Sequence, residues 1–204
     1  MQFKKISIIV FSIVSNSYGI EFNNAKKTVN YITFKAMDKA ICENNLALIK
    51  KLSNEFAFNT YSCASILHLA TEKSNYHATI KILLNSGIDI DKLDCAGNTI
   101  LHLAVNRNDL ALVKYIVNCG AHINSVNTRG ETPLHRAARI NNDNPDITKY
   151  LIENGAQPDV KDFLNNTPSD LAEILGNETI FTSLCTYINA KKENTHYSLA
   201  HLKK

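Results

Sequence analysis

The sequence has no tryptophan, and among its 204 residues only 7 are glycine and 4 are proline. Glycine-rich phosphate loops, collagen-like repeats and proline-rich scaffolds all need more of these residues than the chain contains. Hydrophobic residues make up 45% and charged residues 20%, which excludes an intrinsically disordered chain. A chain of this length buries about 70% of its unfolded surface, so we expect it to fold without disulfides or a metal.

Cysteine is also sparse, and its pattern matches no known kind of site. The five cysteines are odd in number and widely spaced, with no CxxC pair. A structural zinc site or a thioredoxin-type motif therefore has no support in the sequence. We expect Cys42, Cys119 and Cys185 to lie at packed helix positions, and Cys95 to lie exposed on a turn.

No apolar run is long enough to span a membrane comfortably, because a spanning helix needs about 20 residues. The longest, Ile6–Val14, follows Lys4 and Lys5 and precedes small residues up to Gly19. This pattern predicts a signal peptide over residues 1–19 with cleavage after Gly19. A hydrophobic strand or an uncleaved anchor is the alternative. We therefore expect a secreted or periplasmic protein without stable membrane insertion after cleavage; a cytoplasmic protein is the alternative.

The formal net charge of +3 comes from the two ends of the chain. Without Lys4, Lys5 and the segment 191–204, 16 basic residues face 18 acidic ones. Nucleic-acid binding rests on clustered lysine and arginine, so we expect no nucleic-acid partner.

The body of the chain repeats itself. The segments SILHLA (65–70), TILHLA (99–104), TPLHRA (132–137) and TPSDLA (167–172) align, with histidines at 68, 102 and 135 and Asp170 in the fourth place. A second pattern follows the first three: IKILLNSGIDI (80–90), VKYIVNCGAHI (113–123) and ITKYLIENGAQPDV (147–160). A fixed period of 33 to 35 residues is the signature of a repeat architecture.

Each repeat predicts two helices and a turn. Thr99 and Thr132 are expected to cap the first helix, and Pro133 suits its first position. The apolar spacing of Leu112, Val113 and Ile116 predicts the buried stripe of a second helix. Glycines are expected to end the second helices in the left-handed conformation: Gly87, Gly120 and Gly155.

The LHLA and TPLHRAA segments with their glycine-terminated second helices resemble the ankyrin repeat, which implies an all-α solenoid. The resemblance extends to secreted ankyrin-repeat proteins of intracellular bacteria. It implies a protein–protein interaction module that is not an enzyme and needs no cofactor. The boundaries that we expect are a signal peptide (1–19), a degenerate N-terminal capping repeat (20–59), ankyrin repeats (60–93, 94–126 and 127–161), a C-terminal capping repeat (162–190) and a basic tail (191–204).

The repeated histidines could suggest a metal site, but stacked helices lie about 10 Å apart, too far for one zinc ion. In the family this histidine bonds neighbouring backbone, so the resemblance gives His68, His102 and His135 a structural role. No catalytic or metal-binding motif is present.

The resemblance places partner binding on the concave face and the turn tips, where packing does not dictate the residue. The protein partner itself is unknown, and we expect a monomer. The candidate partner-binding residues are Tyr61, Asn98, Arg107, Thr128, Arg129, Glu131, Arg139, Phe163 and Leu164.

Overall fold

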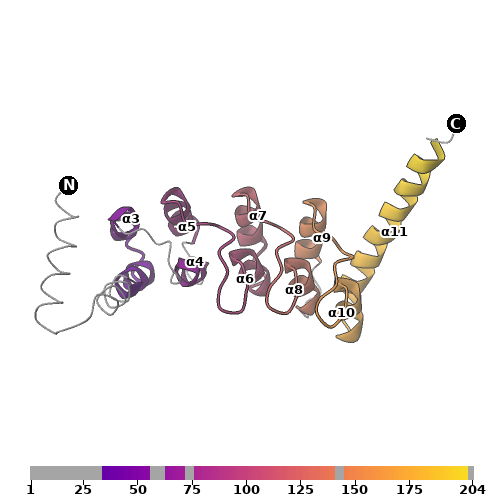
Figure 1. The fold of residues 1–204 in the computed structure, drawn as a ribbon, viewed down its shortest axis with the longest axis horizontal. Helices are drawn as coiled ribbons and strands as arrows, with labels where there is room; N and C mark the ends of the chain where they lie inside the picture. The colour runs from indigo at the N-terminus through magenta and orange to yellow at the C-terminus, as the bar shows by residue number, and fades with distance from the viewer. Residues whose placement is uncertain (1–33, 56–62, 72–75, 141–144, 202–204) are drawn as a thin grey trace, which may run out of the picture. The chain divides into compact units, whose positions relative to one another are not determined.

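The structure is a computed structural model that describes residues 34–55, 63–71, 76–140 and 145–201 (Figure 1). Within these ranges the regular elements are helices, and no strand occurs. This all-α architecture is the predicted fold class. The chain forms two compact units, Met1–Asp89 and Ile90–Lys204.

In its described residues the first unit contains a helical segment over residues 34–42 and three further helices. These are α3 (Leu46–Glu55), α4 (Cys63–Thr71) and α5 (Tyr76–Asn85), and both α3 and α4 pack on α5. Its fully buried side chains are mostly aliphatic: Met37, Ile49, Ile66, Leu67, Ile80 and Leu83.

One local feature of the first unit differs from the repeats that follow. Helix α4 begins at Cys63, which occupies the place of Gly97 in the aligned segment. Gly97 has a φ of 72°, a conformation that a residue with a Cβ adopts reluctantly. In this repeat, the position that holds a turn glycine in the next one is therefore already helical.

The second unit consists of three helix pairs. They are α6 (Ile100–Asn106) with α7 (Leu110–Asn118), α8 (Pro133–Arg139) with α9 (Asp146–Glu153), and α10 (Pro168–Ile174) with α11 (Glu178–His201). Helix α8 packs between α6 and α10, and α9 packs between α7 and α11 (Figure 1). We call α6, α8 and α10 the inner row, and α7, α9 and α11 the outer row.

The core of the second unit lies between these rows. Leu101, Leu112, Ile116, Leu134 and Leu151 are fully buried there. Alanines on the inner row are buried as well, and their small side chains allow helices to approach closely: Ala104, Ala138 and Ala172.

The helix boundaries follow from capping. Thr99, Thr132 and Thr167 stand in extended conformation immediately before α6, α8 and α10. At the other end of a pair, Gly120 has a φ of 92°, and the next amide, Ala121 N–H, donates to Ile116 C=O over 3.3 Å. Gly87 and Gly155 end α5 and α9 with φ values of 84° and 98°. A left-handed residue followed by this long backbone bond is the Schellman ending of a helix.

The cysteine exposures correct part of the sequence-based expectation. Cys95 is exposed on its turn as expected and Cys185 is half-buried, but Cys42 and Cys119 are exposed. Cys119 is the C-cap of α7, one residue beyond the helix. The apolar stripe fixes which side of a helix is buried, but a residue beyond the last helical position no longer follows that stripe.

Helix α11 continues through His201, so the backbone of the predicted basic tail is helical that far. None of the helices in the described ranges has the length and apolar character needed to cross a membrane.

Candidate functional site

The turns that precede the inner helices of the second unit share one construction. Asp94, Asn127 and Asp162 each accept two backbone N–H bonds on Oδ1. Asp94 Oδ1 accepts from Ala96 and Asn98 over 2.8 and 2.7 Å. Asn127 and Asp162 repeat this pattern two and four residues ahead. A side chain that satisfies two amides holds the turn in a single shape.

Successive turns bond directly to one another. Thr128 N–H donates to Ala96 C=O over 3.1 Å, and Phe163 N–H donates to Arg129 C=O over 3.0 Å. A Cβ on Gly97 would lie 2.7 Å from Thr128 N, and one on Gly130 would lie 2.9 Å from Phe163 N. Glycine is required here both for the positive φ and for this close approach.

Two buried histidines join the inner helices α6 and α8 to the turn that follows in the next repeat. The Nδ1 atoms of His102 and His135 accept from the N–H of Thr99 and Thr132, each over 3.1 Å. Nε2 of His102 lies 3.0 Å from Glu131 C=O, and Nε2 of His135 lies 3.1 Å from Asn166 C=O. Because Nδ1 accepts, the proton is on Nε2, which donates across the repeat boundary.

This geometry favours neutral imidazole. Burial lowers the pKa of both His102 and His135 below the ordinary value, and the backbone bonds to Glu131 and Asn166 only partly offset it. In the last repeat Asp170 takes the histidine's place and its Oδ2 accepts from Thr167 N–H over 2.8 Å. This hydrogen bond lowers the pKa of Asp170.

Beside the second of these turns, the carboxylate of Glu131 is surrounded by arginines. Arg129 Nη2 lies 2.9 Å from Oε2, and Arg139 Nε lies 2.7 Å from Oε1. Arg136 Nε lies 3.3 Å from Oε2. The Glu131 side chain is 1% exposed, so these ion pairs form at the bottom of a cluster that we call the arginine cluster: Arg129, Glu131, Arg136 and Arg139.

Two asparagines complete the base of the cluster. The side-chain amide of Asn127 donates both to Glu131 Oε2 and to Asn98 Oδ1, over 3.0 and 3.1 Å. Asn98 Oδ1 also accepts from Arg136 Nη2 over 3.3 Å. Burial by itself would raise the pKa of Glu131, but the bonds from Asn127 and Arg129 and the charges of the other arginines hold that pKa below its usual value.

Comparison with known families identifies this arrangement. A family model of ankyrin repeats, in three copies, matches residues 36–127 and 101–196. The chain belongs to the ankyrin repeat family. A search of curated proteins finds no match.

Most of the residues predicted to line the ankyrin turns and helix edges are exposed. Arg107 is the exposed C-cap of α6, and Thr128, Arg129 and Arg139 are exposed around the second turn. Phe163 and Leu164, on the third turn, are 76% and 77% exposed. Tyr61 lies outside the described residues.

Two of the candidate residues are not exposed tips. Asn98 and Glu131, each one position before a capping threonine, are buried. In this ankyrin turn the fifth residue points inward, where Asn98 and Glu131 bond to Asn127 and to the arginines. They support the surface from below.

Arg136 is not among the residues predicted from the sequence; it is half-buried, hydrogen-bonds to Asn98 and forms an ion pair with Glu131. It stands where Leu103 stands in the preceding ankyrin repeat, and this change to a charged residue was the available signal. Of the other predicted structural residues, His68 is half-buried in α4.

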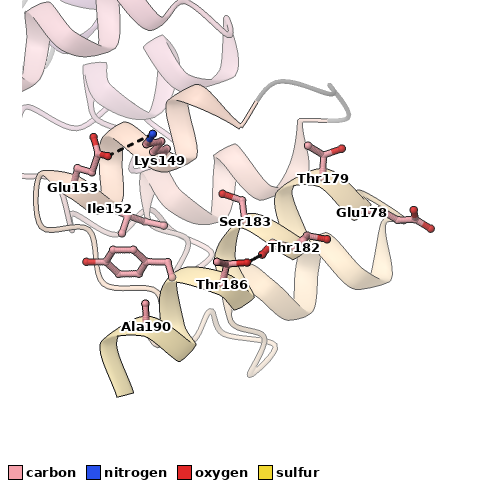
Figure 2. Close-up of a pocket in the computed structure, with 10 residues that line it drawn as sticks. Lys149, Ile152, Glu153, Glu178, Thr179, Thr182, Ser183, Thr186 and Ala190 are labelled. Atoms are coloured by element: carbon pink, nitrogen blue, oxygen red, sulfur yellow. Dashed lines mark hydrogen bonds and ion pairs between the residues drawn. The ribbon is translucent and has the colours of Figure 1, made fainter. Parts of the chain in front are cut away.

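A groove lies along the outer row between α9 and α11 (Figure 2). Ile152 lines it from α9, and hydroxyl-bearing residues line it from α11: Thr179, Thr182, Ser183 and Thr186. On its α9 side, Lys149 Nζ lies 4.0 Å from Glu153 Oε1. Nowhere in the described part of this ankyrin chain do three or more candidate metal ligands come together.

Proposed function

We propose that this ankyrin protein is a non-catalytic module that binds a protein partner through its inner row and its turn tips. Ankyrin repeats suggest protein–protein interaction in general. The observation that supports this surface is the separation of roles along each turn. Asn127 and Gly130 hold the backbone, while Arg129, Phe163 and Leu164 project outward.

A rigid turn with exposed side chains suits recognition because little conformational entropy is lost on binding. Phenylalanine and arginine are also enriched among the residues that dominate binding energies. The proposal includes no cofactor, metal or nucleic acid, and the protein acts as a monomer.

The experiment is affinity capture with the purified full chain as bait, compared with its Arg129→Ala and Phe163→Ala variants. The proposal expects a protein that the unmodified chain retains and that both variants retain less. Sedimentation of the bait alone tests the monomer. Capture that is the same with all three baits, or capture of nothing, contradicts this binding surface.

We propose further that the protein is exported and acts on a target outside the producing cytoplasm, as an effector or envelope protein. The support is the basic, apolar and small-residue order of Met1–Gly19. A cytoplasmic ankyrin scaffold or inhibitor with an intact N-terminus is the alternative. N-terminal sequencing of the protein from its producing cells decides between them, since export expects a chain that begins at or near Ile20. An intact Met1–Gly19 segment on the soluble protein removes the argument for export.

A further inference from the structure

The arginine cluster contains more positively charged groups than negatively charged ones. Three guanidinium groups, those of Arg129, Arg136 and Arg139, contact the single carboxylate of Glu131. The other nearby acids, Asp94 and Asp162, accept hydrogen bonds from their own turns and keep their negative charges, and the charge of Asp94 acts on Arg136. Within the cluster itself three cations face one carboxylate, and two of these cations, Arg129 and Arg139, are exposed.

The excess charge is also oriented. Arg139 contacts the Glu131 carboxylate through its Nε atom, and Arg129 contacts it through its Nε and Nη2 atoms. Within the described residues, Arg139 hydrogen-bonds to that carboxylate through Nε and not through its two terminal nitrogens. The side chains of Arg129 and Arg139 are 58% and 36% exposed, so their outer edges face solvent. A guanidinium that is already fixed at one edge loses little side-chain entropy when a carboxylate binds at the other.

An apolar patch lies next to this charge. The backbone N–H of Phe163 donates to the carbonyl of Arg129, and the aromatic ring lies over the Cα of Gly130, where an added Cβ would be 2.7 Å from Phe163 Cδ1. Leu164 follows on the same turn, and about three quarters of each side chain is exposed, at 76% and 77%. Large apolar residues exposed this far, beside ordered charge, are typical of an interface.

We propose that Arg129, Arg139, Phe163 and Leu164 form a docking surface for an acidic segment of a protein partner. A carboxylate of that segment binds between the two arginines, and a neighbouring apolar side chain packs on Phe163 and Leu164. This inference rests on the proposed protein-binding function and specifies the chemistry of the partner. The apolar pair favours a peptide over a polyphosphate, which would leave Phe163 and Leu164 in water, and aliphatic Leu164 favours an apolar side chain over a stacked base.

The test is selection of peptides from a random twelve-residue display library on the immobilised full chain, followed by titration of the enriched peptides. The inference expects peptides that pair Asp or Glu with a large apolar residue. Arg129→Ala and Phe163→Ala should each weaken their binding about tenfold, a loss that is usual for a dominant interface residue. Arg129→Lys should recover only part of it, because lysine keeps the charge without the planar fork.

Two matched controls separate this surface from general charge or stickiness. Lys149→Ala removes one exposed positive charge from the outer row, and Ile174→Ala removes an exposed apolar side chain at the far end of α10 from the turn. Both should change peptide affinity less than twofold. Thermal melts of Phe163→Ala, Lys149→Ala and Ile174→Ala should match the parent, because these side chains are exposed. Arg129→Ala removes one of three arginines from Glu131, so it should melt slightly lower and still be folded in the titration.

The outcomes distinguish this inference from the proposed function. Enriched peptides without acidic residues, or acidic peptides that bind Arg129→Ala unchanged, overturn the inference and leave protein binding standing. Binding of tripolyphosphate at the same site with loss in Arg129→Ala but not in Phe163→Ala, or binding of an oligonucleotide there in preference to the peptides, also overturns it. Failure to enrich any peptide overturns it too, and if affinity capture also retains no protein, the proposed function fails with it.

Discussion

At the scale of single residues, Glu131 is the most consequential side chain of the second unit. Its carbonyl accepts from His102 Nε2, and its carboxylate contacts Arg129, Arg136 and Arg139. A buried charge is costly unless it is paired and hydrogen-bonded. Three arginines and an asparagine compensate the buried charge of the Glu131 carboxylate. Removing that carboxylate would therefore leave the arginines without their counter-ion.

The first prediction tests this dependence. Glu131→Gln should lower the free energy of unfolding by about 3 kcal/mol, because half-buried Arg136 loses its counter-ion. Urea denaturation at pH 7 measures the change. Glu153→Gln is the matched control, since that carboxylate is more than half exposed opposite Lys149 and should cost less than about 0.5 kcal/mol. A loss no larger for Glu131→Gln than for the control would mean that the cluster contributes nothing to stability.

The second prediction concerns pH. The folded-state pKa values of His102 and His135 are lowered, so at mildly acidic pH the unfolded chain binds protons that the folded chain does not. Their contribution to stability is therefore complete above the unfolded value of about 6.5 and is lost as the pH falls below it. The slope should be at most about 1.4 kcal/mol per pH unit for each histidine.

Urea titrations between pH 7.5 and 5 test the slope. This window lies above the ordinary glutamate pKa, so that Glu131 contributes little to it. The variant His102→Gln/His135→Gln should flatten the curve, while His122→Gln, at an exposed position, should leave it unchanged. If the free energy of unfolding fell equally with pH in the double variant and in the parent, other groups would be its cause.

At the scale of elements, the turns set the spacing of the second unit. Phe163 N–H bonds across to the Arg129 carbonyl, and the backbone passes directly over Gly130. Gly120 has a similar positive φ at the end of α7, but a Cβ there would meet nothing within 4 Å. The two glycines thus separate the cost of conformation from the cost of contact.

The third prediction uses this pair. Gly120→Ala should cost about 1 to 2 kcal/mol, the penalty of a left-handed residue with a side chain. Gly130→Ala should cost this and a further 1 to 3 kcal/mol or so, because the added methyl overlaps the backbone of Phe163. Urea denaturation compares them, and heteronuclear NMR should show shifts at Phe163 in Gly130→Ala alone. Equal losses would contradict the close packing of the turns.

The sequence predicts these elements well where local chemistry decides them. Thr99, Thr132 and Thr167 each stand one residue before a helix, and Gly120 and Gly155 stand just after one. It predicts less where the outcome depends on long-range packing. Asn98 occupies a turn position that is polar in sequence, and its burial follows from contacts with Asn127 on the next turn and with Arg136 on α8.

At the scale of the whole molecule, the residues of the repeats fall into two sets, one buried and one exposed, with different roles. Buried positions on the two rows hold each pair to its neighbour, as in other proteins in which each repeat contacts only the next. Exposed positions at the turns carry charge and apolar surface that this stacking does not use. The two sets touch at Glu131 and Gly130, but the proposed binding side chains are not part of the core.

The fourth prediction follows from this division. His102→Ala removes the acceptor for Thr99 N–H and the donor to Glu131 C=O, both buried, and should lower the free energy of unfolding by about 1 to 3 kcal/mol. Arg129→Ala and Phe163→Ala should leave the melting temperature almost unchanged, because both side chains are largely exposed. Binding of the selected peptide or captured partner should show the opposite order. His102→Ala retains affinity under conditions where it is folded, and the two turn variants lose about 1 kcal/mol or more. Melting curves and titrations on the same preparations decide the question. If His102→Ala abolished binding at full stability, the histidines would be part of the binding surface and the division between inward and outward residues would be wrong.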